Sequence, residues 1–111
     1  MPHFFTDRRG GESLGVYESF NLALHVGDDA QTVIRNRAVI GEAQFMNQVH
    51  GDSVMVIDSI QSQVPTCDGL ITTKSNLQLA VMVADCIPLL LISKEAVGAI
   101  HVGRAGLVNR V

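Results

Sequence analysis

Three residues of types that bind soft transition metals lie at the ends of short apolar segments: His50, Cys86 and His101. His50 is followed directly by Gly51, and His101 is followed two positions later by Gly103. Strand ends beside glycines are places where side chains from different strands converge and a ligand can approach the backbone. Two imidazoles and one thiolate suit zinc or copper, and a set of three protein ligands leaves a fourth position for water or substrate. The pattern therefore predicts a metal site with Zn²⁺ bound, or Cu²⁺ as the alternative.

The same residues also have an ordinary structural interpretation. A cysteine after an apolar strand is commonly a small buried hydrophobe, and a histidine at a strand end is commonly a half-buried hydrogen-bonding residue. The three positions are far apart in the chain, so they form no local finger motif and the fold would have to assemble them. Spacing alone leaves both interpretations open. Cys67 lies in a predicted turn and is expected to take no part in the chemistry, although an exposed thiolate there could be oxidised.

Composition excludes several classes of protein. A chain of 111 residues with 47% apolar and 17% charged residues has room for one globular domain. The net charge of −3 is scattered and contains no basic block, which argues against a nucleic-acid partner. The apolar runs are too short to span a membrane, and charged residues at positions 7–9 do not fit a signal peptide. We therefore expect a cytoplasmic protein with no membrane partner.

The elements that must position these residues are one helix and a set of short strands. Asp28 or Asp29 is expected to cap a helix that runs to about Gly41, with its apolar side formed by Val33, Ile34, Val39 and Ile40. β-Branched runs between turn formers predict strands at residues 44–49, 53–57, 69–73, 78–84, 89–93 and 97–102, after a short strand at 3–6.

The last three of these strands are apolar on both faces, which predicts a sheet covered on both sides in an α/β or α+β fold. Residues 103–111 predict a turn entering a helix whose pattern runs to the last residue. We therefore expect residues 1–111 to be the N-terminal part of a longer domain. Uncovered strand edges in such a chain would favour self-association.

Several sequence blocks, in this order, carry a resemblance to a known family. They are Ser19-Phe20-Asn21-Leu22, His25-Val26-Gly27-Asp28, Asn36-Arg37, Gln48-Val49-His50-Gly51, Asp68-Gly69-Leu70-Ile71-Thr72, Ala84-Asp85-Cys86 and His101-Val102-Gly103. With them, the chain resembles the YfiH-like laccase-domain family over nearly its whole length. The resemblance implies an α/β (α+β) fold with mixed β-sheets in layers with helices, and a single laccase-like domain over residues 1–111.

The resemblance also implies a site and an activity. The family's metal ligands fall on His50, Cys86 and His101, in agreement with the residue types. Family members resemble phosphorylases of adenosine, inosine and methylthioadenosine with some adenosine deaminase activity, so the implied partners are a nucleoside and phosphate. Older descriptions call them copper polyphenol oxidases, and bacterial relatives are linked to editing of peptidoglycan precursors.

Further residues are assigned to substrate and catalysis. We assign substrate binding to Arg8, Asn21, Arg37 and Arg104, and an acid or base role to Asp85 beside the cysteine. Many family members have Trp-Arg after the His-x-Gly block, whereas this chain has Arg104 directly, followed by alanine. The arginine is displaced by one position, which puts its role toward an anion in question.

Three other functions stay open at this point. Copper-dependent oxidation of phenols is one, although the four histidines are few for multicopper chemistry. A cysteine hydrolase or amidase is another, with Cys86 as nucleophile and His101 or His50 as its base. The last is a metal-stabilised folding unit without turnover, in which removal of the metal lowers thermal stability alone.

Overall fold

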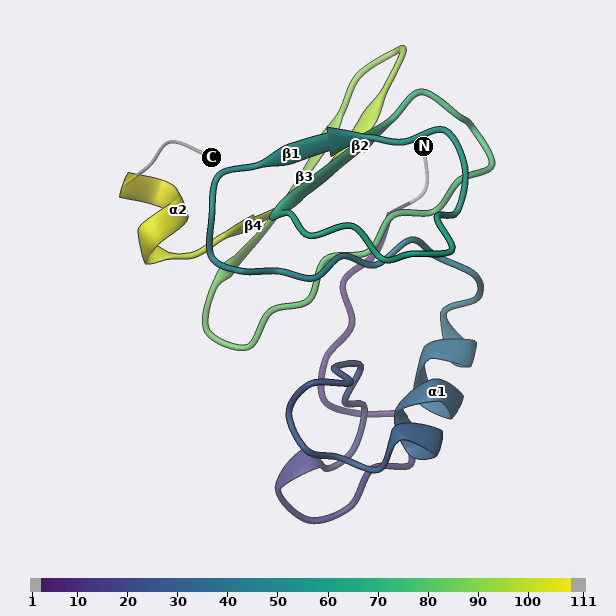
Figure 1. Ribbon diagram of the computed structural model, residues 1–111. Coiled ribbons are helices and arrows are strands. Elements are labelled where there is room, and N and C mark those ends of the chain that lie inside the picture. The colour runs from purple at the N-terminus through teal and green to yellow at the C-terminus, as the bar shows by residue number, and fades with distance from the viewer. Residues whose placement is uncertain (1–2, 109–111) are drawn as a thin grey trace. The chain divides into compact units, whose positions relative to one another are not determined.

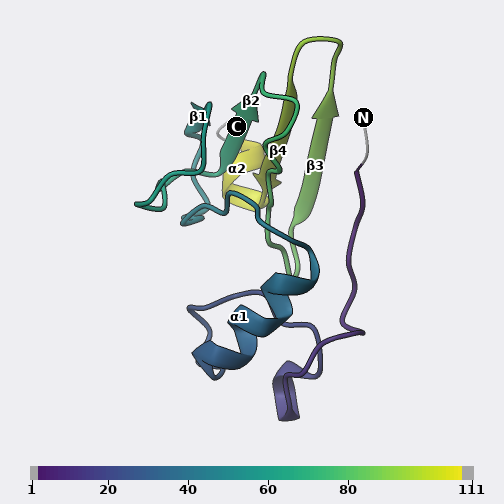
Figure 2. The same ribbon diagram turned by 90° about the vertical axis from the view of Figure 1, so that its right-hand side faces the viewer.

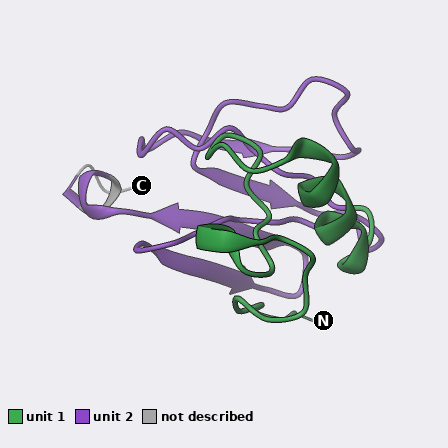
Figure 3. Cartoon of the chain, turned by 90° about the horizontal axis from the view of Figure 1, so that it is seen from below, with its two compact units in different colours: residues 1–42 green, residues 43–111 purple. Residues whose placement is uncertain are grey.

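The computed structural model describes residues 3–108 and divides the chain into two compact units, residues 1–42 and 43–111 (Figure 3). The first unit contains a short 3₁₀ helix, η1 (Gly15–Tyr17), and the helix α1. The second contains the strands and the short helix α2 (Arg104–Val108) (Figure 1). Within residues 3–108, no helix has the length and apolar character needed to cross a membrane.

The predicted helix is present as α1 (Ala30–Val39). It begins where the Asp29 carboxylate accepts a hydrogen bond from the backbone N–H of Thr32 at 3.0 Å, which satisfies a donor left free at the helix start. Ile40 closes the helix, and Gly41 follows it with φ of 81°, the left-handed conformation that commonly ends helices. The capping signals in the sequence therefore located both ends.

The buried side of α1 differs from the one expected. Val33 and Asn36 are buried, whereas Ile34 and Val39 are 50% and 68% exposed. The expectation that all the apolar residues of the helix face the core was wrong. Asn36 occupies a buried position of the helix because the backbone groups of the neighbouring loop need hydrogen-bond partners.

Asn36 organises the loop that precedes α1. Its side-chain N–H groups donate to Ser13 Oγ at 2.9 Å and to the carbonyl of Asn21 at 2.8 Å, and its Oδ1 accepts from the backbone N–H of Glu12 at 2.8 Å. This loop is held by hydrogen bonds rather than by strand pairing. The strand expected at residues 3–6 is absent.

The second unit is built on a four-stranded mixed sheet (Figures 1 and 2). The strands are β1 (Val54–Val56), β2 (Gly69–Thr72), β3 (Ile87–Ile92) and β4 (Val97–Val102). Their order across the sheet is β1-β2-β4-β3; β1 and β2 are parallel, and β4 is antiparallel to both of its neighbours. The expected α+β fold with a mixed sheet is confirmed.

Two expected strands, residues 44–49 and 78–84, are not strands. They run beside each other and share one isolated parallel bridge between Gln44 and Leu79. Further along, the side chain of Gln48 replaces the backbone ladder: its Nε2 donates to the Met82 carbonyl at 2.6 Å, and its Oε1 accepts the Met82 N–H at 2.8 Å. The apolar pattern identified extended segments correctly, but side-chain hydrogen bonds tie them together in place of a regular ladder.

The core of this unit is a cluster of buried side chains from β2, from these extended segments and from nearby residues. Its buried members are Met46, Ile57, Cys67 and Leu70, and the partly buried Leu77, Leu79 and Val81 pack against them. The Cys67 side chain is fully buried, which contradicts the alternative of an exposed thiolate open to oxidation. Burial raises the pKa of the Cys67 thiol, which leaves it a small hydrophobe.

The sheet is not covered evenly. The four central residues of β4 are buried, whereas four apolar residues of β3 are between 40% and 58% exposed: Ile87, Leu89, Leu91 and Ile92. β3 is an edge strand, paired with a neighbour on one side only. The expectation of apolar strands covered on both faces was therefore wrong for β3.

Candidate metal centre

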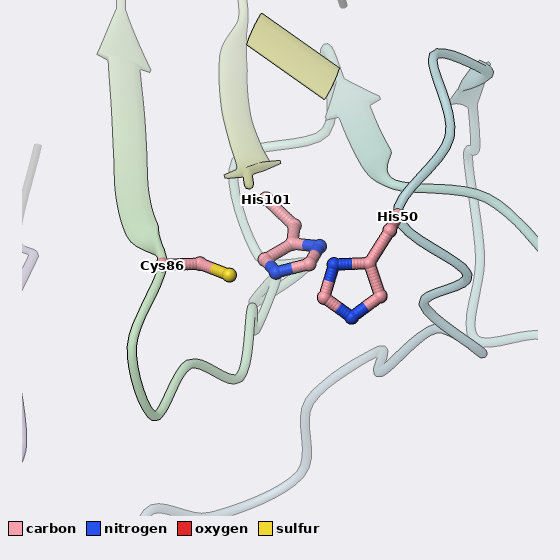
Figure 4. A group of neighbouring side chains, drawn as sticks. All are labelled: His50, Cys86 and His101. Carbon is pink, nitrogen blue, oxygen red and sulfur yellow. The ribbon is translucent and has the colours of Figure 1, made fainter. Parts of the chain in front are cut away.

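The fold brings together His50, Cys86 and His101. Cys86 directly precedes β3, His101 lies in β4 opposite Pro88 in the strand register, and His50 lies in a turn before β1. One ligand atom from each of the three residues lies within 4.8 Å of the other two. Figure 4 shows the three side chains turned toward a common space. All three belong to the second unit, so the cluster is contained within one compact body.

The turn at His50 has an unusual backbone. His50 has φ of 59°, the left-handed conformation that residues other than glycine seldom adopt. The N–H groups of Val49, His50 and Gly51 all donate to the carboxylate of Asp68, at 3.1, 2.9 and 2.9 Å. Three consecutive backbone donors thus surround a single anion, which holds the turn in its strained conformation.

His101 is held by the same aspartate. The backbone N–H of His101 donates to the Asp68 carbonyl at 2.7 Å, and His101 Nδ1 lies 2.7 Å from Asp68 Oδ2. The His101 side chain is 4% exposed, and its ring lies edge-on to the His50 ring with centroids 4.8 Å apart. The orientation of this imidazole is therefore set by contacts on its main chain and on its ring.

Asp68 is the residue that sequence reasoning missed at this site. It is fully buried, and burial alone would raise the pKa of its carboxyl group. The hydrogen bonds from His101 and from the backbone N–H groups of residues 49–51 outweigh burial, so the pKa of Asp68 lies below its ordinary value of 3.8. The available signal was an acidic residue directly before an apolar strand, a position where a charge needs dedicated partners.

Gly103 leaves room for the donors. A Cβ atom at this position would lie 3.0 Å from His50 Nδ1 and 3.2 Å from Cys86 Sγ, closer than ordinary van der Waals contact. Within the described part of the chain, neither the His50 ring nor the Cys86 sulfur forms a hydrogen bond. Two nitrogen donors and one sulfur donor, close together and cleared of competing side chains, fit a zinc or copper ion.

Two other residues assigned from the sequence lie in the same unit. Asp85 is exposed, and its carboxylate makes no hydrogen bond or ion pair with any described residue. Arg104 is exposed at the start of α2, and its guanidinium likewise pairs with no described residue. Both side chains are accessible to solvent and to a ligand.

The remaining assigned residues belong to the first unit. Arg8 Nε donates to the carbonyl of residue 18 at 3.2 Å, and Arg37 Nε donates to the carbonyl of residue 22 at 2.8 Å. Burial lowers the pKa of the Arg37 guanidinium. The Asn21 amide donates to Asp28 Oδ2 at 3.2 Å and to a nearby carbonyl. These side chains therefore stabilise the loop around Asn36 as well as being candidates for substrate binding.

The sequence of the chain is similar to a family of known proteins. The family model described as "Multi-copper polyphenol oxidoreductase laccase" matches residues 2–111. The chain belongs to this laccase-domain family. The resemblance that the sequence blocks carried is thereby confirmed.

Relatives of this laccase-domain chain are named as purine nucleoside phosphorylases rather than as oxidoreductases. A Corynebacterium glutamicum protein named purine nucleoside phosphorylase is 43% identical over 96% of this chain and 49% of its own length. Purine nucleoside phosphorylase YlmD of Geobacillus stearothermophilus is 33% identical over 96% of this chain and 46% of its own. The chain spans about half the length of the curated relatives it matches.

Solved structures show the same fold. The crystal structure of a Neisseria meningitidis protein, NMB0706, has a TM-score of 0.86 at 35% identity, over 92% of this chain and 45% of that one. The crystal structure of YlmD from Geobacillus stearothermophilus matches this chain with a TM-score of 0.83 at 34% identity, over 89% of this chain and 44% of that one.

Proposed function

We propose that this chain carries the metal centre of a zinc-dependent purine nucleoside enzyme, with His50, Cys86 and His101 as the ligands. The convergence of these three donors to within 4.8 Å is the observation that carries the proposal. The relatives named purine nucleoside phosphorylase support the class of substrate. The reactions proposed are phosphorolysis of adenosine, inosine or methylthioadenosine, and hydrolytic deamination of adenosine.

The chemistry that bound zinc supplies is Lewis acidity toward an oxygen atom of the substrate or of water. The residues of the chain have the other tasks. Asp85, an exposed carboxylate next to Cys86, is proposed to accept or return a proton at the reacting nucleoside. Arg104 is proposed to hold the phosphate, because its exposed guanidinium presents several N–H donors to a tetrahedral anion.

Arg8, Asn21 and Arg37 are proposed to contribute further contacts to the nucleoside or to phosphate. In the first unit each uses part of its donor capacity on backbone or side-chain acceptors. A guanidinium has five N–H donors, so the bond that Arg8 donates from Nε leaves its terminal nitrogens for a ligand. Variants at these positions are expected to change KM for phosphate or nucleoside more than kcat.

The first test is elemental analysis of protein purified without added metal. About one zinc per chain is expected in the wild type, and none in a Cys86→Ala variant. His25→Ala, which removes an exposed imidazole in the first unit, is the control and should retain the metal. Folded wild-type protein without metal would refute the zinc site and favour Cys86 as a nucleophile.

Activity is tested separately on the same protein. Release of hypoxanthine from inosine that requires added phosphate would support phosphorolysis, and release of ammonia from adenosine would support deamination. Zinc-loaded protein with neither activity would identify this chain as a metal-stabilised unit without turnover, while leaving the metal site intact.

Copper-dependent oxidation of phenols is the second candidate, favoured by the description of the family. It predicts copper in the elemental analysis and oxygen consumption with a phenol as substrate. Zinc as the only metal, with no oxygen uptake, would exclude it.

A further inference from the structure

We propose that Asp68 is a positioning residue that fixes both imidazoles of the metal centre before a metal binds. The inference rests on the proposed metal site and deepens it. Asp68 Oδ1 accepts the N–H groups of Val49 and Gly51, and Oδ2 accepts the N–H of His50 while it contacts His101 Nδ1. One buried carboxylate therefore links two proposed ligands that come from different parts of the sequence.

The backbone of Asp68 contributes to the same arrangement. Its N–H donates to the carbonyl of Ser53 at 3.0 Å, just before β1, and its carbonyl accepts the N–H of His101 at 2.7 Å in β4. The carboxylate, the N–H and the carbonyl of Asp68 are thus all hydrogen-bonded, to residues 49–51, to Ser53 and to His101. A residue whose polar groups are all hydrogen-bonded has little freedom to move, so it holds both imidazoles in fixed positions.

For His50, the effect of Asp68 is on the backbone. The left-handed conformation at His50 is sparsely populated for residues with a Cβ atom and persists only where surrounding contacts hold it. Three successive N–H groups that donate to one carboxylate stabilise this conformation. The direction in which the His50 side chain leaves the backbone therefore depends on Asp68.

For His101, the effect is on the ring proton. The oxygens of Asp68 already act as acceptors for three backbone donors, so the short contact at 2.7 Å is an N–H donated by His101 Nδ1. A neutral imidazole carries one N–H, and Nε2 is then the nitrogen with a free lone pair. Asp68 thus selects Nε2 as the donor of His101, as carboxylates behind metal-binding histidines do.

Asp68→Asn reverses this selection while it preserves size. The amide has one acceptor oxygen, and its NH₂ group must face either the backbone donors of residues 49–51 or His101 Nδ1. In the second orientation the amide donates to Nδ1, and the imidazole proton moves to Nε2. The affinity of the variant for Zn²⁺ is expected to fall by about 10- to 100-fold. Asp58→Asn, which removes an exposed carboxylate in the same unit, is the control and should bind Zn²⁺ as the wild type does.

The decisive experiment has one measurement on the wild type and one on the variants. Long-range ¹H–¹⁵N NMR of metal-free wild-type protein, at a pH where His101 is neutral, identifies which nitrogen carries the proton. Nδ1–H is expected, and Nε2–H would overturn the proposal even if the variant does not fold. Competition with a chromophoric chelator then compares Zn²⁺ affinity in D68N, D58N and wild type; equal affinities in all three would also overturn it.

The outcomes separate this proposal from the proposed function. Wild-type protein that holds the Nδ1–H tautomer but binds no Zn²⁺ would refute the metal site and leave Asp68 as the residue that orients both rings. Tight Zn²⁺ binding by a protein with the Nε2–H tautomer would refute only the role of Asp68. A purely structural role would lower the melting temperature of D68N without moving the proton of His101.

Discussion

Replacing Gly103 with alanine adds a single methyl group to the middle of the proposed metal site. The new Cβ would lie 3.0 Å from His50 Nδ1 and 3.2 Å from Cys86 Sγ. Both donors must retreat by a few tenths of an ångström, because these separations are tighter than most real Cβ contacts. A donor set has to be held within roughly 0.5 Å of its productive geometry to bind well, so the methyl group acts directly on metal affinity.

The magnitude follows from the cost of overpacking. Inserting a methylene-sized group into a packed site typically costs about 1–3 kcal/mol. If this cost falls on the metal-loaded site, it corresponds to an increase of about 5- to 150-fold in the Kd for Zn²⁺. The backbone adds no strain of its own, since Gly103 does not have the left-handed φ that disfavours alanine.

Gly98→Ala in β4, the strand that ends directly before Gly103, is the matched control. Its Cβ would make only ordinary contacts, at 3.5 Å from Ile71 Cγ1 and 3.7 Å from Leu91 Cβ. Zn²⁺ affinity of wild type, G103A and G98A is measured by competition with a chromophoric chelator, with circular dichroism to establish folding. Folded G103A with wild-type affinity, or an equal loss in G98A, would show that the space at Gly103 does not control the site.

Three further predictions address the thiols, the extended segments and pH. Iodoacetamide should alkylate the half-buried Cys86 before the buried Cys67, because burial raises the pKa of the Cys67 thiol. Bound Zn²⁺ should protect Cys86 from alkylation. Mass spectrometry that finds Cys67 modified first would contradict this prediction. Gln48→Ala removes two hydrogen bonds to Met82, each worth about 1 kcal/mol, so thermal melts should show lower stability. The hydrogen bond from the Ser13 hydroxyl lowers the pKa of Asp28 below its ordinary value of 3.8. The ionised carboxylate therefore stabilises the fold above pH 3.8. This contribution is lost as the pH falls through the folded-state pKa. Urea denaturation should therefore find D28N less stable than wild type at pH 7, with a difference that shrinks as the pH falls below 3.8. A difference independent of pH would refute the linkage.

Local signals predicted those parts of the fold that local chemistry governs. The N-cap at Asp29 and the glycine after Ile40 are short-range features, and they placed α1 correctly. The four strands of the sheet are runs of apolar residues bounded by turn formers. The choice of which apolar residues of α1 are buried failed, because it depends on how Asn36 satisfies a loop more than a dozen positions away.

The candidate site shows the same division. Residue types and sequence blocks selected the three candidate donors, because metal chemistry restricts the choice to a few side chains. Periodicity predicted neither the burial of Cys67 nor the role of Asp68. An acidic residue directly before an apolar strand marks Asp68 as a charge that needs partners, but it does not show which residues supply them. A buried carboxylate becomes recognisable only when its partners are known.

The sequence by itself thus determined the helix, the four strands of the sheet and the choice of candidate donors, because capping, turn chemistry and ligand preference act within a few residues or through side-chain type. Only the tertiary structure decided that these donors meet, and that Asp68 joins His50 and His101 across 18 and 33 positions of the chain. Such hydrogen bonds depend on the pairing of strands that are distant in sequence. Their partners are therefore fixed by the folded backbone and not by the local order of residues.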